Sequence, residues 1–169
     1  MVSEWRALAA RQGGGRVWQT LIRSYDPAAQ CGTGAKSAGL AALEISFAGE
    51  VPPALVELLR TLDGAFDGQG SALCWCAERI RDENLRMRTS PLYRESYMPF
   101  DSLLFFAEEE CGRRVGLAVI PGMITQPNVY MWDPVNDSRT WVAASLGQYL
   151  LARARRGACS AQVVEATPA

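Results

Sequence analysis

Four short apolar segments follow one another between residues 101 and 144, and they constrain the fold more than any other part of this sequence. They read DSLLFFA, RRVGLAVI, NVYMW and RTWVAA, and polar stretches containing Gly, Pro, Asn, Asp or Glu separate them. Apolar runs of this length, bounded by turn residues, are typical of β-strands. Because short connections join neighbouring antiparallel strands, this region predicts an antiparallel or mixed sheet.

Helical patterns precede and follow these strands. The clearest helix begins at Pro53 and ends at Asp63-Gly64, and its apolar residues repeat at i, i+3, i+4 and i+7. These residues are Leu55, Leu58, Leu59 and Leu62. An earlier helical stripe is formed by Leu40, Leu43 and Phe47. Helices, then strands, then a closing helix predict an α+β fold whose sheet is covered on one face.

The remaining segments give weaker signals. Ser3 can cap a short helix through Arg11, residues 16–25 fit a helix or a strand, and the small polar residues of 26–39 predict a mobile loop. Residues 71–77 fit a strand, and residues 77–88 fit a short polar helix or an extended edge. Ser145 and Gln148 match the capping box of the last helix, which we expect to fray after Gly157.

We therefore predict one domain in three parts. Residues 1–39 form an N-terminal helix and glycine-rich loop that pack on the domain or lead into it, residues 40–156 form the core, and residues 157–169 form a flexible tail. A chain of 169 residues that is 49% hydrophobic suffices for one core and is too short to expect two.

Composition also excludes several environments. Charged residues interrupt every apolar stretch well before the ~20 residues that a membrane span needs, and MVSEWRALAA lacks the features of a signal peptide. We expect a cytoplasmic protein without a membrane partner. The formal net charge of -1 provides no global field that would gather nucleic acid.

The chain contains no histidine, which excludes much enzyme chemistry. Ser/His/Asp and Cys/His catalysis and His-based zinc sites all require this residue. The odd number of cysteines in a chain without a secretion signal predicts free, mostly buried thiols rather than disulfides, a metal site or a redox site. They are Cys31, Cys74, Cys76, Cys111 and Cys159. We predict no enzyme activity, no cofactor and no metal.

Three other patterns have a functional and a structural interpretation, and the structural one is favoured each time. Glu108 to Glu110 with Asp101 offer cation ligands, but a solvated charge cluster fits a turn better. Asp133 and Asp137 offer the paired carboxylates of a glycosidase, yet such residues usually bond the turn's own backbone. The stretch GTGAKS lacks the spacing of a phosphate-binding loop, which favours a linker.

Arginines between residues 79 and 94 alternate with aromatic residues, as on a nucleic-acid surface. Asp82, Glu83 and Glu95 interrupt this pattern and weaken that interpretation. A protein-binding face, where Arg, Trp and Tyr are the enriched residue types, is favoured.

The order of these motifs resembles the SUKH superfamily, the Smi/Knr-like domains. The resemblance covers about residues 40–152 and the first helix, and it includes VPPALVELLRTLDGAFD, the segment from LCWCAERIRDENLRMR to EEECG, and NVYMWDPVNDSRTWVAASLGQYL. The preference for arginine over lysine is similar to that of actinobacterial sequences. Two departures are the stretch 111–114, CGRR in place of the family's G-D, and the absence of a clear family helix before residue 40.

The resemblance implies a single α+β domain with a curved, mostly antiparallel or mixed sheet, flanking helices and no catalytic activity. Many bacterial members are immunity proteins that neutralise polymorphic toxins, often nucleases or deaminases, and others are regulatory or scaffold proteins. The oligomeric state stays open, and nucleic acid is disfavoured as a partner.

A partner is then expected on the exposed sheet face and its bordering loops. The candidate residues are Trp75, Tyr97, Asp101, Glu108, Glu109, Trp132, Asp137 and Arg139. We expect Glu108 and Glu109 to be exposed turn charges that steer a basic toxin and contribute little to stability. For Trp132 and Trp141, burial in the core is favoured over partner contact.

Overall fold

The computed structural model describes residues 17–48, 50–93, 99–119 and 128–165, with side chains through residue 156. The helices are α2 (Val17–Tyr25), α3 (Ser37–Ser46), α4 (Pro53–Thr61), α5 (Ala77–Thr89) and α6 (Leu146–Glu165). The strands are β1 (Gln30–Cys31), β2 (Ala65–Phe66), β3 (Ala72–Cys74), β4 (Leu103–Glu108), β5 (Arg114–Ala118), β6 (Val129–Asp133) and β7 (Ser138–Ala143). Short 3-10 turns are η1 (Pro91–Tyr93), η2 (Phe100–Ser102) and η3 (Glu110–Gly112).

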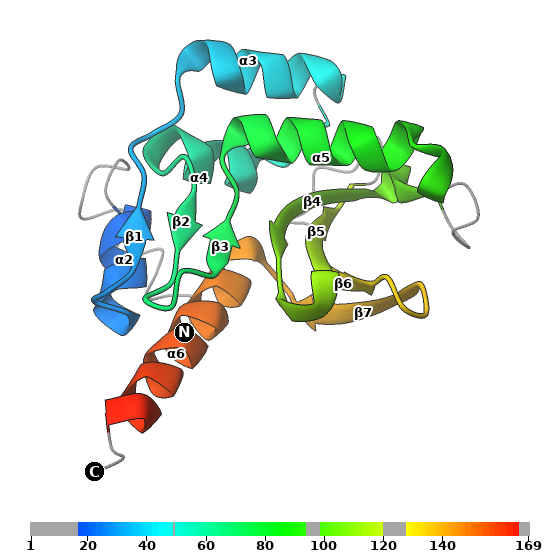
Figure 1. Ribbon diagram of the computed structural model, residues 1–169. Coiled ribbons are helices and arrows are strands. Elements are labelled where there is room, and N and C mark those ends of the chain that lie inside the picture. Colours follow the sequence, from blue (N-terminus) through cyan, green and yellow to red (C-terminus); the bar gives the residue numbers. More distant parts are fainter. Residues whose placement is uncertain (1–16, 49, 94–98, 120–127, 166–169) are drawn as a thin grey trace.

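The four strands expected from residues 101–144 form one antiparallel sheet in the order β4-β5-β6-β7. Figure 1 shows that this sheet is curved and that α5 passes over one side of it. The predicted α+β fold is confirmed. A second antiparallel sheet, in the order β1-β2-β3, was not predicted, because β1 and β2 have two residues each and such short strands leave no periodic signal.

Two sets of hydrogen bonds join the second sheet and α5 to the edge of β4. The Trp75 amide, which follows β3, donates to the Phe106 carbonyl over 2.8 Å. The buried Asn84 side chain on α5 donates to the Phe105 carbonyl over 2.7 Å and accepts from the Phe105 amide over 2.8 Å. This edge of β4 is therefore capped by a neighbouring segment and by a side-chain amide, as buried backbone groups require.

The helix that begins at Pro53 forms as predicted, with the proline in its first turn. All four leucines of its stripe are fully buried, and Leu40, Leu43 and Phe47 from the α3 region are also buried. Both helices contribute to one core that also contains Phe105 and Phe106 of β4. The stripes are thus structural, which agrees with their interpretation from sequence.

The predicted mobile loop at 26–39 differs from the structure. Part of it is β1, its last residues open α3, and three backbone hydrogen bonds tie it to the end of α4 and the following turn. These bonds join Gly32 N to Gly64 O, Asp63 N to Thr33 O and Ala35 N to Leu59 O. A Cβ on Gly34 would lie 2.0 Å from the Arg60 carbonyl oxygen, so glycine there permits the close approach.

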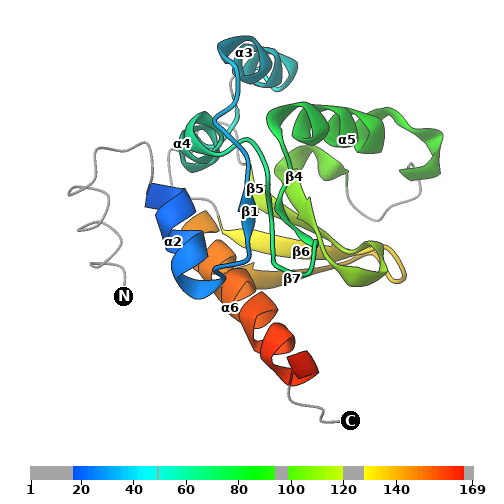
Figure 2. The same cartoon turned by 60° about the vertical axis from the view of Figure 1, so that its left-hand side comes forward.

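Residues 16–25, left as helix or strand, form α2 from Val17, which packs against α6 as Figure 2 shows. The predicted end of the last helix at Gly157 is wrong, because α6 continues to Glu165. Its start agrees with the capping box in part. Ser145 Oγ accepts from the Gln148 amide over 3.3 Å, but the Gln148 side chain accepts from Ala144 instead of Ser145. The helix expected at residues 3–11 lies outside the described residues.

Among the described helices, none is both long and apolar enough to span a bilayer.

Candidate protein-binding surface

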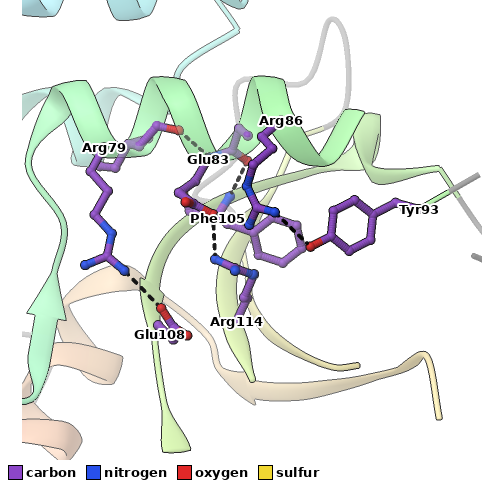
Figure 3. Close-up of polar contacts among 9 residues, drawn as sticks. Arg79, Glu83, Arg86, Tyr93, Phe105, Glu108 and Arg114 are labelled. Atoms are coloured by element: carbon purple, nitrogen blue, oxygen red, sulfur yellow. Dashed lines mark hydrogen bonds and ion pairs between the residues drawn. The ribbon is translucent and has the colours of Figure 1, made fainter. Parts of the chain in front are cut away.

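A charged surface that includes the predicted site residue Glu108 lies where α5 crosses the end of the four-stranded sheet. Arg79, Glu83 and Arg86 occupy one side of α5, because positions i, i+4 and i+7 share a helix face. Figure 3 shows these side chains beside Glu108 of β4, Arg114 of β5 and Tyr93 of η1. We call this set of six residues the α5 rim.

Ion pairs connect the α5 rim. Arg79 Nη2 donates to Glu108 Oε2 over 3.0 Å. Glu83 Oε2 lies 2.7 Å from Arg86 Nη2 and 3.0 Å from Arg114 Nη1, so two guanidinium groups share one carboxylate oxygen (Figure 3). Arg86 Nη1 also donates to the Tyr93 hydroxyl over 3.3 Å. The rim is therefore ordered before any partner arrives.

The charges of the rim set the protonation of its central carboxylate. Burial raises the pKa of Glu83, but the hydrogen bond from Arg86 and the positive charges of Arg114, Arg86 and Arg79 outweigh burial and lower it overall. The hydrogen bond to Glu83 in turn raises the pKa of Arg86. Glu83 and Arg86 therefore both carry their charges at neutral pH.

Aromatic rings lie beneath the arginines. The Arg79 guanidinium carbon lies 4.7 Å from the Trp75 ring centre, that of Arg114 lies 5.6 Å from the same ring, and that of Arg86 lies 5.7 Å from the Tyr93 ring. Trp75 itself is only 2% exposed. The arginines therefore cover most of the Trp75 ring, and its contact with a partner stays a prediction.

One cross-strand row brings three predicted site residues together. Glu108, Arg114, Trp132 and Arg139 are partners in register across β4, β5, β6 and β7. Side chains that are opposite in adjacent strands share a face of the sheet. Arg114 was missed by sequence reasoning, although its position opposite two predicted site residues follows once the strand register is known.

Trp132 is part of the core at 4% exposure, which confirms its expected burial, and its contact with a partner stays a prediction. Its ring centre lies 5.1 Å from Phe100 and 6.0 Å from Tyr93, both in edge contacts. Its Nε1 donates to Asp137 Oδ1 over 2.6 Å, and Asp137 adopts a positive φ of 54° at the hairpin. Asp137 thus holds the indole in place.

The other polar residues of this hairpin also bond locally. Asp133 Oδ1 accepts from the Val135 amide over 2.9 Å, and Asn136 Oδ1 accepts from the Ser138 amide over 3.0 Å. This agrees with the structural interpretation of the loop. Arg139 donates to the Pro99 carbonyl over 3.3 Å and lies 5.1 Å from the Phe100 ring, which closes the turn over Trp132.

Trp141 differs from its expected place in the core. Its side chain is 54% exposed on β7, the outer strand of the sheet, and its Nε1 lies 3.5 Å from Asn128 Oδ1. Trp141 is opposite Tyr130. This pair is two positions along the strands from the Trp132–Arg139 pair and therefore lies on the same face of the sheet. It was not among the predicted site residues, yet it is the tryptophan that the described residues leave accessible.

Glu109 is not the exposed turn charge that was predicted. Its side chain is 14% exposed and faces α6, where Oε1 accepts from Arg156 over 2.9 Å and from the Tyr149 hydroxyl over 3.2 Å. Arg153 lies 3.7 Å from the same oxygen and 3.0 Å from the buried Asp67. Glu109 therefore fastens α6 to the end of β4.

A cleft of about 300 Å³ adjoins the α5 rim, between β3 and the end of β4. Trp75, Glu108 and Glu109 line it together with Arg79, Arg153 and Phe66. Its size is at the low end of the range of about 300–1,000 Å³ that small-molecule sites span. Among the described residues, no three acidic or cysteine side chains are grouped as a metal site would require.

Of the eight predicted site residues, Glu108 alone belongs to the α5 rim as defined above. Asp101 is exposed on η2, and Tyr97 lies outside the described residues.

The thiols are unpaired at Cys31, Cys74, Cys76 and Cys111. Burial, and then the charge of Asp63, raises the pKa of the buried Cys74 thiol, which keeps this thiol protonated. Cys111 is exposed, which differs from the prediction that the cysteines are mostly buried.

Comparison with known families agrees with this fold. A family model described as SMI1-KNR4 cell-wall, of the SUKH group, matches residues 38–150. The match includes both predicted helices before the strands, all four strands of the larger sheet and the start of α6. The chain therefore belongs to the SUKH superfamily. A comparison with curated proteins finds no match.

Proposed function

We propose that this protein is a non-enzymatic, cytoplasmic binding module that acts as an immunity protein and neutralises a bacterial polymorphic toxin by binding it. Membership of the SUKH superfamily carries the proposal, because many bacterial members have this role. The α5 rim supports it. Arginine and tyrosine side chains that are ordered in advance are the residue types that most often carry binding energy in protein interfaces.

The absence of enzyme activity is part of the same proposal. A chain without histidine needs another group whose pKa lies near neutrality, and carboxylates or thiols are the remaining candidates. Glu83 is held charged by its arginines, and Glu109 is engaged by α6. Cys74 is buried with a raised pKa. These groups therefore serve better as structural and binding elements than as acids, bases or nucleophiles.

The arginines of α5 also favour a protein partner over nucleic acid. Arg79 pairs with Glu108, Arg81 with Asp82 and Arg86 with Glu83. Carboxylates at these distances oppose the close phosphate contacts that produce salt-dependent nucleic-acid binding. We expect no binding to random single-stranded RNA or DNA, even at low ionic strength, in a gel-shift experiment.

The test begins with the gene neighbourhood. A toxin gene encoded beside this one should inhibit growth when expressed alone, and co-expression of this protein should restore growth and yield a complex that co-elutes in size-exclusion chromatography. A neighbourhood of metabolic genes, together with a failure to recover any protein by co-purification, would contradict the immunity role. A regulatory protein without a toxin partner would then be the favoured interpretation.

A further inference from the structure

The α5 rim has more cationic than anionic groups. Three guanidinium groups, Arg79, Arg86 and Arg114, accompany two carboxylates, Glu83 and Glu108. The neighbouring Arg81–Asp82 pair is neutral by itself and does not change this balance. The rim therefore has one positive charge that no carboxylate of the rim balances.

The excess of positive charge lies around Glu83. Both Arg86 and Arg114 approach the same oxygen, Oε2. Arg114 is 11% exposed, and its Nη1 lies 3.0 Å from that oxygen without the alignment of a hydrogen bond, so it is a buried donor that is only partly satisfied. Because this nitrogen is buried, a negative charge placed nearby stabilises Arg114 through its electric field rather than by a further hydrogen bond.

The groups that a partner would meet first are exposed. The Arg79 and Arg86 side chains are 46% and 45% exposed, and their guanidinium groups lie over the rings of Trp75 and Tyr93. A guanidinium presents five N–H donors in a fork that matches the two oxygens of a carboxylate. Stacking reduces the conformational entropy that such a contact would otherwise cost.

We propose that the α5 rim receives a carboxylate of a protein partner, an Asp or Glu side chain that binds one of the two exposed guanidinium groups, Arg86 or Arg79, and supplies the missing negative charge near Arg114. This inference rests on the proposed function, because it names the chemistry of the partner at that site. It reverses the sequence-based expectation, in which acidic residues of this face would meet a basic toxin. A single carboxylate fits better than a phosphate backbone, whose repeated charges would meet Glu83 and Glu108.

Hexaglutamate and hexalysine serve as partner-independent probes. In NMR titrations of the full chain, hexaglutamate is expected to shift the Nε–Hε resonances of Arg79 and Arg86, and hexalysine is expected to leave them in place. Arg86→Gln should weaken hexaglutamate binding by about two- to fivefold, the range of one exposed ion pair. Glu83→Gln should strengthen it, because the intramolecular carboxylate that competes for the arginines is gone.

Arg60→Gln is the matched control, because Arg60 is an exposed arginine on α4. It should leave hexaglutamate binding unchanged. Equal weakening by Arg60→Gln and Arg86→Gln, or weaker binding by a folded Glu83→Gln variant, would overturn the proposal. If Glu83→Gln does not fold, Arg79→Gln decides, and unchanged affinity of that variant counts against the rim.

The same variants separate this inference from the proposed function when the neighbouring toxin is used. If wild-type protein neutralises the toxin but Arg86→Gln binds it with unchanged affinity, the carboxylate contact is wrong and the immunity role stands. If no toxin is found but the hexaglutamate titrations behave as expected, the immunity role fails and the carboxylate site stands.

Discussion

Asn84 is a single residue that takes the place of a neighbouring strand. Its amide bonds both backbone groups of Phe105, and its nitrogen also donates to the Ile80 carbonyl over 2.7 Å. Asn84→Ala would leave the buried amide and carbonyl of Phe105 without partners. We expect a loss of about 2–5 kcal/mol in the free energy of unfolding, measured by urea denaturation.

The same substitution at an exposed asparagine is the control. Asn136 accepts one bond from Ser138 in the β6–β7 hairpin, and Asn136→Ala should cost less than about 1 kcal/mol. Equal costs at both positions would mean that the amide clamp on β4 contributes little.

The two tryptophans of the last hairpin should respond differently to truncation. Trp132→Ala removes a buried ring from an aromatic cluster and should destabilise the protein by about 3–5 kcal/mol. Trp141→Ala removes an exposed ring and should cost less than about 1 kcal/mol. Thermal melting followed by circular dichroism measures both, and a large loss at Trp141 would contradict its exposure.

These tryptophans also mark a limit of sequence reasoning. Trp132 pairs with Arg139 and Trp141 pairs with Tyr130, so both rings point to the same face of the sheet and strand alternation cannot separate them. What separates them is the cover that Phe100 and Tyr93 provide over Trp132. Such cover comes from segments distant in sequence and is not encoded in the local pattern.

At the scale of elements, two adjacent glutamates at the end of β4 serve different helices. Glu108 pairs with Arg79 of α5, and Glu109 with Arg153 and Arg156 of α6. Glu109→Gln should therefore lower the free energy of unfolding by about 1–3 kcal/mol, whereas Glu108→Gln should cost less than about 1 kcal/mol. Urea denaturation of both variants tests this difference, and equal effects would argue against a specific role of Glu109 in fastening α6.

Tyr149 of α6, which is buried beside Glu109, should make the protein less stable as the pH becomes alkaline. Burial, and then the negative charge of Glu109, raises the pKa of Tyr149 above its ordinary value of 10.0. Because the unfolded chain releases this proton first, the stability that Tyr149 contributes is complete below about pH 10 and is lost as pH rises further.

Tyr149→Phe removes this titration. In urea denaturation between pH 9 and pH 12, its stability should fall less steeply with pH than that of the wild type. Parallel curves for the two proteins would mean that Tyr149 titrates normally in the folded state.

Element boundaries were predictable where a backbone signal exists. Pro53 opens α4 and Gly64, with a φ of 94°, follows its end, as their residue types require. The ion-pair partners of Glu108 and Glu109 were not predictable. Alternation along a strand sends consecutive side chains to opposite sides, but only the packing of α5 and α6 determines which arginines they meet.

For the whole molecule, the consecutive order of the larger sheet was accessible from sequence because each strand pairs with the next one along the chain. The smaller sheet was not, since Gln30 of β1 pairs with Phe66 of β2 across two intervening helices. The α5 rim was accessible only in part. Arg79, Arg86 and the two glutamates were identified and Arg114 was not, and the pairing of these residues depends on α5 crossing this particular end of the sheet.

The consecutive pairing of β4 to β7 has a kinetic consequence. Contacts between chain neighbours close small loops and form early, whereas the union of β1 with β2 must close a long loop first. In pulse-labelling hydrogen exchange during refolding, amides of β5 and β6 should be protected before those of β1. Since α5, β4 and β5 are contiguous along the chain, the charged face that they share can assemble on a nascent polypeptide before the ribosome has released α6.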